Sequence, residues 1–150
     1  MTKKIIFRGL WISCLAFSGL ALGAVHEVKD GQSIQAAVTK AKAGDTIKVF
    51  PGTYHETVFV DKDDISLIGV VENGEWPHLD GDKILNDAVL YSGNGFSVEW
   101  FKITEYKGNA IMGQSGNNFS IRNNWVIDTG LYGIFPEFGH NGLIENNILS

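Results

Sequence analysis

Two acidic residues occupy equivalent positions in a repeated stretch of the sequence. Glu105 and Asp128 are 23 residues apart (128 minus 105), and each closes an apolar segment that is followed by a glycine-containing turn. Two carboxylates on stacked strands, about 5 Å apart, repel each other unless a proton or a cation lies between them. The pair could therefore bind Ca²⁺, which prefers oxygen ligands. The alternative is that both are ordinary solvated turn acids.

A second group of residues could bind a sugar. Tyr132, Glu137 and His140 lie in the segment LYGIFPEFGHNG, residues 131–142. Sugars stack on exposed aromatic faces and form hydrogen bonds with nearby polar groups, so these three side chains are candidate carbohydrate ligands. Arg122 is a further candidate, because a guanidinium group binds a carboxylate such as that of a uronate through two hydrogen bonds. The alternative for the turn residues, His140 included, is a purely structural role.

The spacing of 23 residues also places some of these candidates beside other side chains. Arg122 shares it with Glu99 and Glu145, which predicts an alternating ion-pair ladder on the solvent face as the alternative role of the arginine. Phe135 shares it with Met112 and with Val89, which favours a core position for Phe135.

The same interval runs through the second half of the sequence. It separates Gly93, Gly116 and Gly139, and it separates three sets of apolar residues: Val98, Ile121 and Ile144; Ile103, Val126 and Leu149; Ala88, Ile111 and Ile134. A repeat of this length is too short for a strand, helix and strand unit, and it predicts a parallel β-helix in which equivalent positions stack. The first two sets should point inward. Asn124 and Asn147 should form a side-chain amide ladder at a turn.

The N-terminal half is organised differently. Ser33 can cap a helix that Gly44 ends, and the apolar residues between them follow a helical stripe, which predicts a helix over about residues 32–43. Short β-branched and aromatic strands should follow on both sides of a turn at residues 61–64. Residues 72–87 fit the repeat poorly, so we expect a looped-out insertion there.

This organisation resembles the pectin-lyase-like superfamily of right-handed parallel β-helix proteins. The resemblance is carried by the opening SIQAAVTKAKAGDTIKVFPGTY, by ISLIG and HLDG, and by repeats of the form FSIRNNWVI. It implies one all-β solenoid domain over residues 24–150, with an N-terminal capping helix and 23-residue rungs that are clean over residues 88–150. The superfamily includes polysaccharide lyases, alginate C5-epimerases and a periplasmic protein that assists copper maturation of nitrous oxide reductase. Many of its lyases use Ca²⁺ to bridge a polyuronate to the protein.

Residues 1–23 predict export. They have a basic start, an apolar run of about 15 residues and small residues at the end, which is typical of a secretory signal peptide and too short for a membrane span. We therefore expect a periplasmic or secreted protein with no membrane span after cleavage. The single cysteine, Cys14, lies in this segment, so disulfides would not stabilise the exported protein.

Charge narrows the partners. Without residues 1–23 the chain has 9 lysines and arginines (12 minus 3) against 17 acidic residues, which argues against nucleic acid. We expect a protein that interacts with a polysaccharide, as a polyuronate lyase, a C5-epimerase or the N-terminal part of one. The alternative is a non-catalytic scaffold or maturation factor that binds a periplasmic partner protein. No catalytic residue stands out, and because Ser150 falls inside a rung, we expect the repeats to continue.

Overall fold

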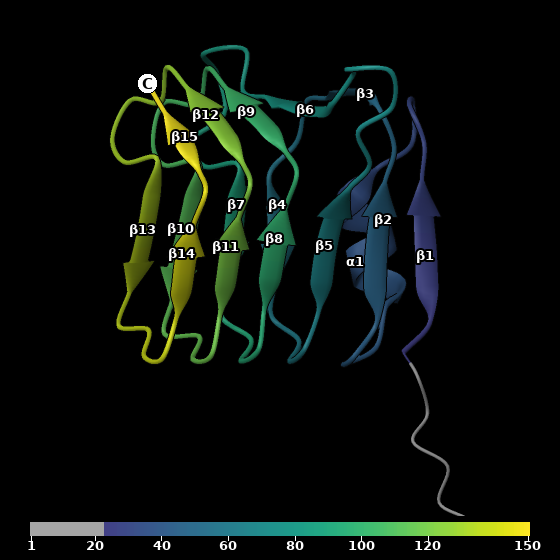
Figure 1. Cartoon of the computed structure of the whole chain (residues 1–150), viewed down its shortest axis with the longest axis vertical. Coiled ribbons are helices and arrows are strands. Elements are labelled where there is room, and N and C mark those ends of the chain that lie inside the picture. The colour runs from purple at the N-terminus through teal and green to yellow at the C-terminus, as the bar shows by residue number, and fades with distance from the viewer. Residues whose placement is uncertain (1–22) are drawn as a thin grey trace, which may run out of the picture.

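The computed structural model describes residues 23–150, which form a parallel β-solenoid of about five turns (Figure 1). Sheet A contains β1 (Val25–Val28), β2 (Thr46–Val49), β5 (Ser66–Gly69), β8 (Ser97–Glu99), β11 (Ser120–Arg122) and β14 (Leu143–Glu145). Sheet B contains β3 (Gly52–Tyr54), β6 (Pro77–Asp80), β9 (Lys102–Thr104), β12 (Trp125–Ile127) and β15 (Ile148–Leu149). Sheet C contains β4 (Val58–Val60), β7 (Val89–Tyr91), β10 (Ile111–Gln114) and β13 (Ile134–Glu137).

The chain passes from sheet A to sheet B to sheet C in each turn and coils in a right-handed sense (Figure 1). The prediction of an all-β parallel β-helix with 23-residue rungs and one N-terminal helix is confirmed. The predicted signal peptide lies, except for Gly23, outside the described residues. Within residues 23–150, no helix is long and apolar enough to span a membrane.

Stacked aliphatic side chains fill the interior. Val98, Ile121 and Ile144 pair in register in sheet A, and Ile103, Val126 and Leu149 do so in sheet B, as predicted. Parallel strands lie about 4.8 Å apart, so each inward side chain packs on its counterpart in the next rung. Ile144 and Leu149 belong to the last rung described and are about half exposed.

The third predicted column is shifted by one residue. Ile111 pairs with Val89 rather than Ala88, because 22 residues (111 minus 89) separate this pair, one fewer than the usual interval. On the other side Phe135 pairs with Met112 on the outer face of sheet C, where side chains are only partly buried. The predicted core position of Phe135 is therefore wrong.

Side-chain amides hold the corners of the solenoid in register. Asn124 is buried; its Oδ1 accepts a hydrogen bond from the backbone N–H of Phe101 (3.1 Å), and its Nδ2 donates to Oδ1 of Asn147 (3.0 Å). The predicted amide ladder is confirmed. Two further ladders occupy the other corners, and their members are Asp63, Asn94 and Asn117 in one and Asp87 and Asn109 in the other.

Helix α1 (Ile34–Lys40) covers the N-terminal end of sheet C. The hydroxyl of Ser33 caps it by accepting a hydrogen bond from the backbone N–H of Ala36 (3.0 Å). The helix is shorter than predicted. Its C-cap is Ala41, and the next backbone N–H, that of Lys42, donates to the carboxylate of Asp45 (2.9 Å) instead of extending the helix.

An insertion interrupts the repeat between β5 and β6. Glu72 and Glu75 exchange backbone hydrogen bonds (3.0 and 2.8 Å) across a turn in which Asn73 and Gly74 have φ of 52° and 84°. Two successive residues with positive φ are typical of a tight hairpin that begins Asn-Gly. The expected loop over residues 72–87 is therefore wrong in part, because β6 lies within it and pairs with β3 and β9.

Candidate functional site

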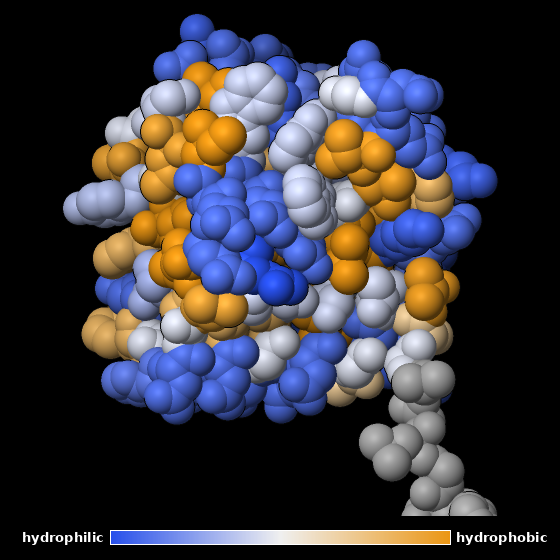
Figure 2. All heavy atoms as spheres, viewed as in Figure 1, coloured by the Kyte–Doolittle hydropathy of each residue, from blue (hydrophilic) through white to orange (hydrophobic). Residues whose placement is uncertain are grey.

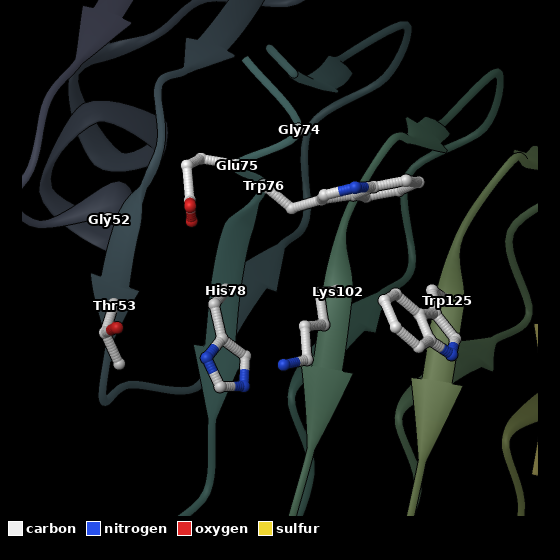
Figure 3. A pocket seen from close by; sticks show the side chains of 8 residues that line it. All are labelled: Gly52, Thr53, Gly74, Glu75, Trp76, His78, Lys102 and Trp125. Carbon is white, nitrogen blue, oxygen red and sulfur yellow. The ribbon is translucent and has the colours of Figure 1, made fainter. Parts of the chain in front are cut away.

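The outer face of sheet B carries a shallow pocket of about 230 Å³ (Figure 3). Thr53, His78, Lys102 and Trp125 form its floor, since the parallel register brings these four side chains into one column across β3, β6, β9 and β12. The remaining lining residues are Gly52 and the hairpin residues Gly74, Glu75 and Trp76. The inserted hairpin thus forms one wall of the pocket.

Three tryptophans meet at this wall. The ring centroid of Trp76 is 5.9 Å from that of Trp100 and 6.3 Å from that of Trp125, with the rings tilted by 47° and 70°. Such distances and angles are favourable for aromatic pairs. Trp100 and Trp125 remain 40% and 36% exposed, so the cluster presents indole surface to solvent instead of filling a core.

Trp100 has an unusual backbone conformation. Its φ is +67°, in the left-handed region, at the corner between β8 and β9. The equivalent residues of the next two rungs are Asn123 and Asn146, both with φ of 56°. Asparagine tolerates this region, whereas a bulky side chain there costs about 1–2 kcal/mol. The tryptophan is thus held at a position that favours asparagine.

Lys102 supplies a positive charge to the floor. Its ammonium nitrogen lies 5.6 Å from the ring centroid of Trp125, a cation–π distance. Within residues 23–150, no carboxylate lies within 4.0 Å of this nitrogen, since the ion pairs there involve only His26, Lys83 and Arg122. The charge is therefore available to a ligand.

His78 contributes a neutral polar group. Its Nε2 is 2.8 Å from Oγ1 of Thr104, which fixes the orientation of the ring. Burial and, next, the charge of Lys102 lower the pKa of His78 below its usual value of 6.5. The imidazole is consequently uncharged at pH 7. Together the pocket offers indole faces, one cation and neutral hydrogen-bonding groups, a combination suited to a sugar ring.

The structure places Arg122 away from this pocket, on the outer face of sheet A. Its guanidinium nitrogens lie 3.4 Å from Glu99 and 3.9 Å from Glu145, so the ion-pair ladder considered as its alternative role is present. Figure 2 shows hydrophilic residues gathered over β8 and β11. A uronate would have to compete with both carboxylates, and binding by Arg122 stays a prediction.

Tyr132, Glu137 and His140 also lie outside the pocket. The ring of Tyr132 packs on Phe135 at 5.0 Å, and Glu137 ends β13 on the sheet C side. The backbone N–H of His140 donates to Oδ1 of Asn117 (3.0 Å), so His140 continues a corner ladder. Tyr132 and His140 are exposed, and their role in sugar binding stays a prediction.

Glu105 and Asp128 follow β9 and β12 at equivalent corners, with φ of 60° and 51°. The carboxylate of Glu105 lies 3.5 Å from the ammonium of Lys83, which offsets its charge. In the part of the chain that the structure describes, no three His, Cys, Asp or Glu side chains form a group able to hold a metal. Calcium binding by this pair stays a prediction.

The pocket residues were missed in the sequence, although part of the signal is there. Trp100, Lys102 and Trp125 lie in the clean repeats, and in a strand with alternating burial Lys102 and Trp125 both fall at outward positions. An outward tryptophan beside a lysine one rung away is a detectable pattern. Trp76 and His78 could not be placed, because the hairpin breaks the period before them.

Comparison with known proteins gives no family model, curated protein or solved structure that matches this chain. The parallel β-solenoid therefore stands on the structure itself. A fold of this kind accepts many functions, so function must be argued from the pocket.

Proposed function

We propose that the protein is an exported β-helix protein that binds a polysaccharide in the pocket on sheet B. The observation that carries the proposal is the cluster of Trp76, Trp100 and Trp125 on an exposed sheet face. Flat indole rings bury the apolar face of a sugar while nearby polar groups bind its hydroxyls. Export rests on the signal-like residues 1–23, and polysaccharide as the ligand class also agrees with the resemblance drawn from the sequence.

The backbone of Trp100 supports the same proposal. Strained residues persist where the surrounding structure holds them, and they cluster at ligand sites. Asparagine at this corner would relieve the strain, as it does in the next two rungs. Keeping a tryptophan there lowers stability, which is understandable if its ring serves the pocket by supporting Trp76.

The test is calorimetric titration of the full chain with a panel of neutral and acidic oligosaccharides. Trp125→Ala removes a lining ring and should weaken binding about tenfold, since aromatic contacts are worth about 0.5–1.5 kcal/mol. Trp100→Asn should also weaken binding, yet raise the free energy of unfolding by about 1 kcal/mol. This second variant separates loss of the site from loss of the fold.

Phe138→Ala is the matched control, because Phe138 is an exposed aromatic residue outside the pocket. It should bind as the wild type does. Binding to none of the saccharides, or binding that survives Trp125→Ala unchanged, would contradict the proposal. Conversion of an acidic oligosaccharide to an unsaturated or epimerised product would extend it to a lyase or a C5-epimerase.

A second candidate function rests on the same cluster. Tryptophan is enriched among the residues that dominate protein–protein binding energy, so the pocket could receive a side chain of a partner protein. A non-catalytic periplasmic scaffold would then bind that partner through sheet B. Binding of a purified periplasmic protein that is lost in Trp125→Ala, with no saccharide bound, would favour this alternative.

A further inference from the structure

The ammonium of Lys102 is a half-buried charge without a protein counter-charge. Acidic residues outnumber basic ones in this chain, 17 to 12, yet none within residues 23–150 forms an ion pair with Lys102. Its aromatic contact, with Trp125, satisfies a cation only in part. The neighbouring floor residue His78 is a neutral imidazole held by Thr104, so it adds no counter-charge. An anionic group of a ligand would complete this site.

The pocket is also polar along its length. Figure 3 shows the carboxylate of Glu75 above the end formed by Thr53 and His78, whereas Lys102 lies toward Trp125 and directs its ammonium to the space beside His78. Negative charge is therefore opposed at the β3 end and attracted at the β9 end. A ligand whose acidic group lies at Lys102 should present an uncharged, hydroxyl-rich part to Glu75.

The floor column fixes the direction of the ligand. Thr53, His78, Lys102 and Trp125 come from four successive strands of sheet B, so the column runs along the solenoid axis. Three steps of about 4.8 Å give a length of about 14 Å, which suits an extended ligand more than a single ring. Trp76 and the hairpin border the column on the side of sheet A and favour this direction over one across the strands.

We propose that the pocket selects a saccharide with mixed charge, in which an acidic unit is bound by Lys102 and the adjoining unit, toward β3, is neutral and faces Glu75. The chain lies along the solenoid axis, and the acidic group is a carboxylate or a sulfate. This inference deepens the proposed function and rests on it.

Titration calorimetry with four oligosaccharides of equal length tests the proposal. One is neutral, one is a uniform polyuronate, one alternates uronate with neutral units, and one alternates sulfated with neutral units. An alternating compound should bind best, about tenfold more tightly than the neutral one. Its affinity should fall as salt rises, while that of the neutral compound should not. The two alternating compounds distinguish a carboxylate from a sulfate.

Variants separate charge recognition from stacking. Lys102→Met should reduce binding of the alternating compound to the level of the neutral one, and Lys102→Arg should retain most of it. Lys48→Met is the matched control, because Lys48 also lies over an aromatic ring, that of Phe50 at 5.2 Å, but on sheet A. Glu75→Gln should strengthen binding of the uniform polyuronate severalfold by removing the opposing charge.

The outcomes separate this inference from the function on which it rests. If the neutral compound binds as tightly as the alternating ones, or if Lys102→Met keeps the preference for acid, the inference is overturned while polysaccharide binding stands. If the uniform polyuronate binds best and Glu75→Gln leaves its affinity unchanged, the mixed-charge pattern is overturned. If no compound binds the wild type, both the inference and the proposed function fail.

Discussion

Trp100 shows, at the scale of one residue, what the sequence could and could not predict. The ladder of Asn124 and Asn147 was predictable, because the same residue type recurs at the interval of the repeat and amides stack. The left-handed backbone of Trp100 was not, since tryptophan rarely adopts it. Its contact with Trp76 depends on a hairpin that the period does not describe. Structural residues repeat, whereas functional residues break the repeat.

Asp45 gives a prediction at the same scale. Its carboxylate accepts hydrogen bonds from the backbone N–H groups of Lys42 (2.9 Å) and Ala24 (2.8 Å) and contacts Nε2 of His26 (2.8 Å). These contacts, that with the N–H of Lys42 foremost, lower its pKa from 3.8 to about 2. A lowered pKa stabilises the fold fully above the unfolded value, and this stability is lost as pH falls through the folded value.

Asp45→Asn should therefore lower the melting temperature at pH 7, and the difference from the wild type should shrink between pH 4 and pH 2. Thermal unfolding followed by circular dichroism at several pH values measures it. Asp61→Asn, which changes an exposed carboxylate after β4, is the control. A constant difference across this pH range would mean that Asp45 does not stabilise the fold through its charge.

At the scale of elements, helix α1 takes the place of a strand at the end of sheet C. Oε1 of Gln35 accepts a hydrogen bond from the backbone N–H of Phe59 (2.6 Å) on β4, the edge strand. The ammonium of Lys62 donates to the carbonyls of Val38 (2.7 Å) and Thr39 (3.1 Å) at the end of the helix. Side chains thus satisfy an edge that would otherwise be open to pairing with another chain.

Glu56 anchors the start of this helix. Its carboxylate accepts hydrogen bonds from the hydroxyl of Ser33 (2.8 Å) and from the backbone N–H groups of Ile34 (2.7 Å) and Gln35 (3.1 Å). Glu56→Gln should lower the free energy of unfolding by about 1–2 kcal/mol, because charged hydrogen bonds to a helix start are lost. Urea unfolding measures the change. An equal effect of Glu27→Gln, on exposed strand β1, would refute the anchoring role.

The elements themselves were predictable to different degrees. The helix was found from its cap and apolar stripe, although its end was placed too late because the contact between Lys42 and Asp45 joins residues through a side chain. Strand β6 was lost inside the segment judged irregular, because the hairpin shifts the spacing before it. One inserted hairpin therefore concealed both a strand and half of the pocket.

At the scale of the molecule, the period predicted the fold because inward side chains of stacked rungs must match in size and polarity. Outward side chains are free of this requirement, so the period carried no information about the pocket on sheet B. The three tryptophans among residues 23–150 nevertheless meet at that pocket, and the fourth, Trp11, lies in the predicted signal peptide. Intrinsic fluorescence of the protein without its signal peptide therefore reports on the proposed site alone.

The most direct measurement is a titration of tryptophan fluorescence with the alternating acidic oligosaccharide. Covering the exposed faces of Trp100 and Trp125 should shift the emission to shorter wavelength and saturate at the affinity that calorimetry gives. Trp125→Ala should remove most of the shift. Calorimetric binding with no change in emission would place the saccharide elsewhere on the solenoid and contradict the assignment of the sheet B pocket.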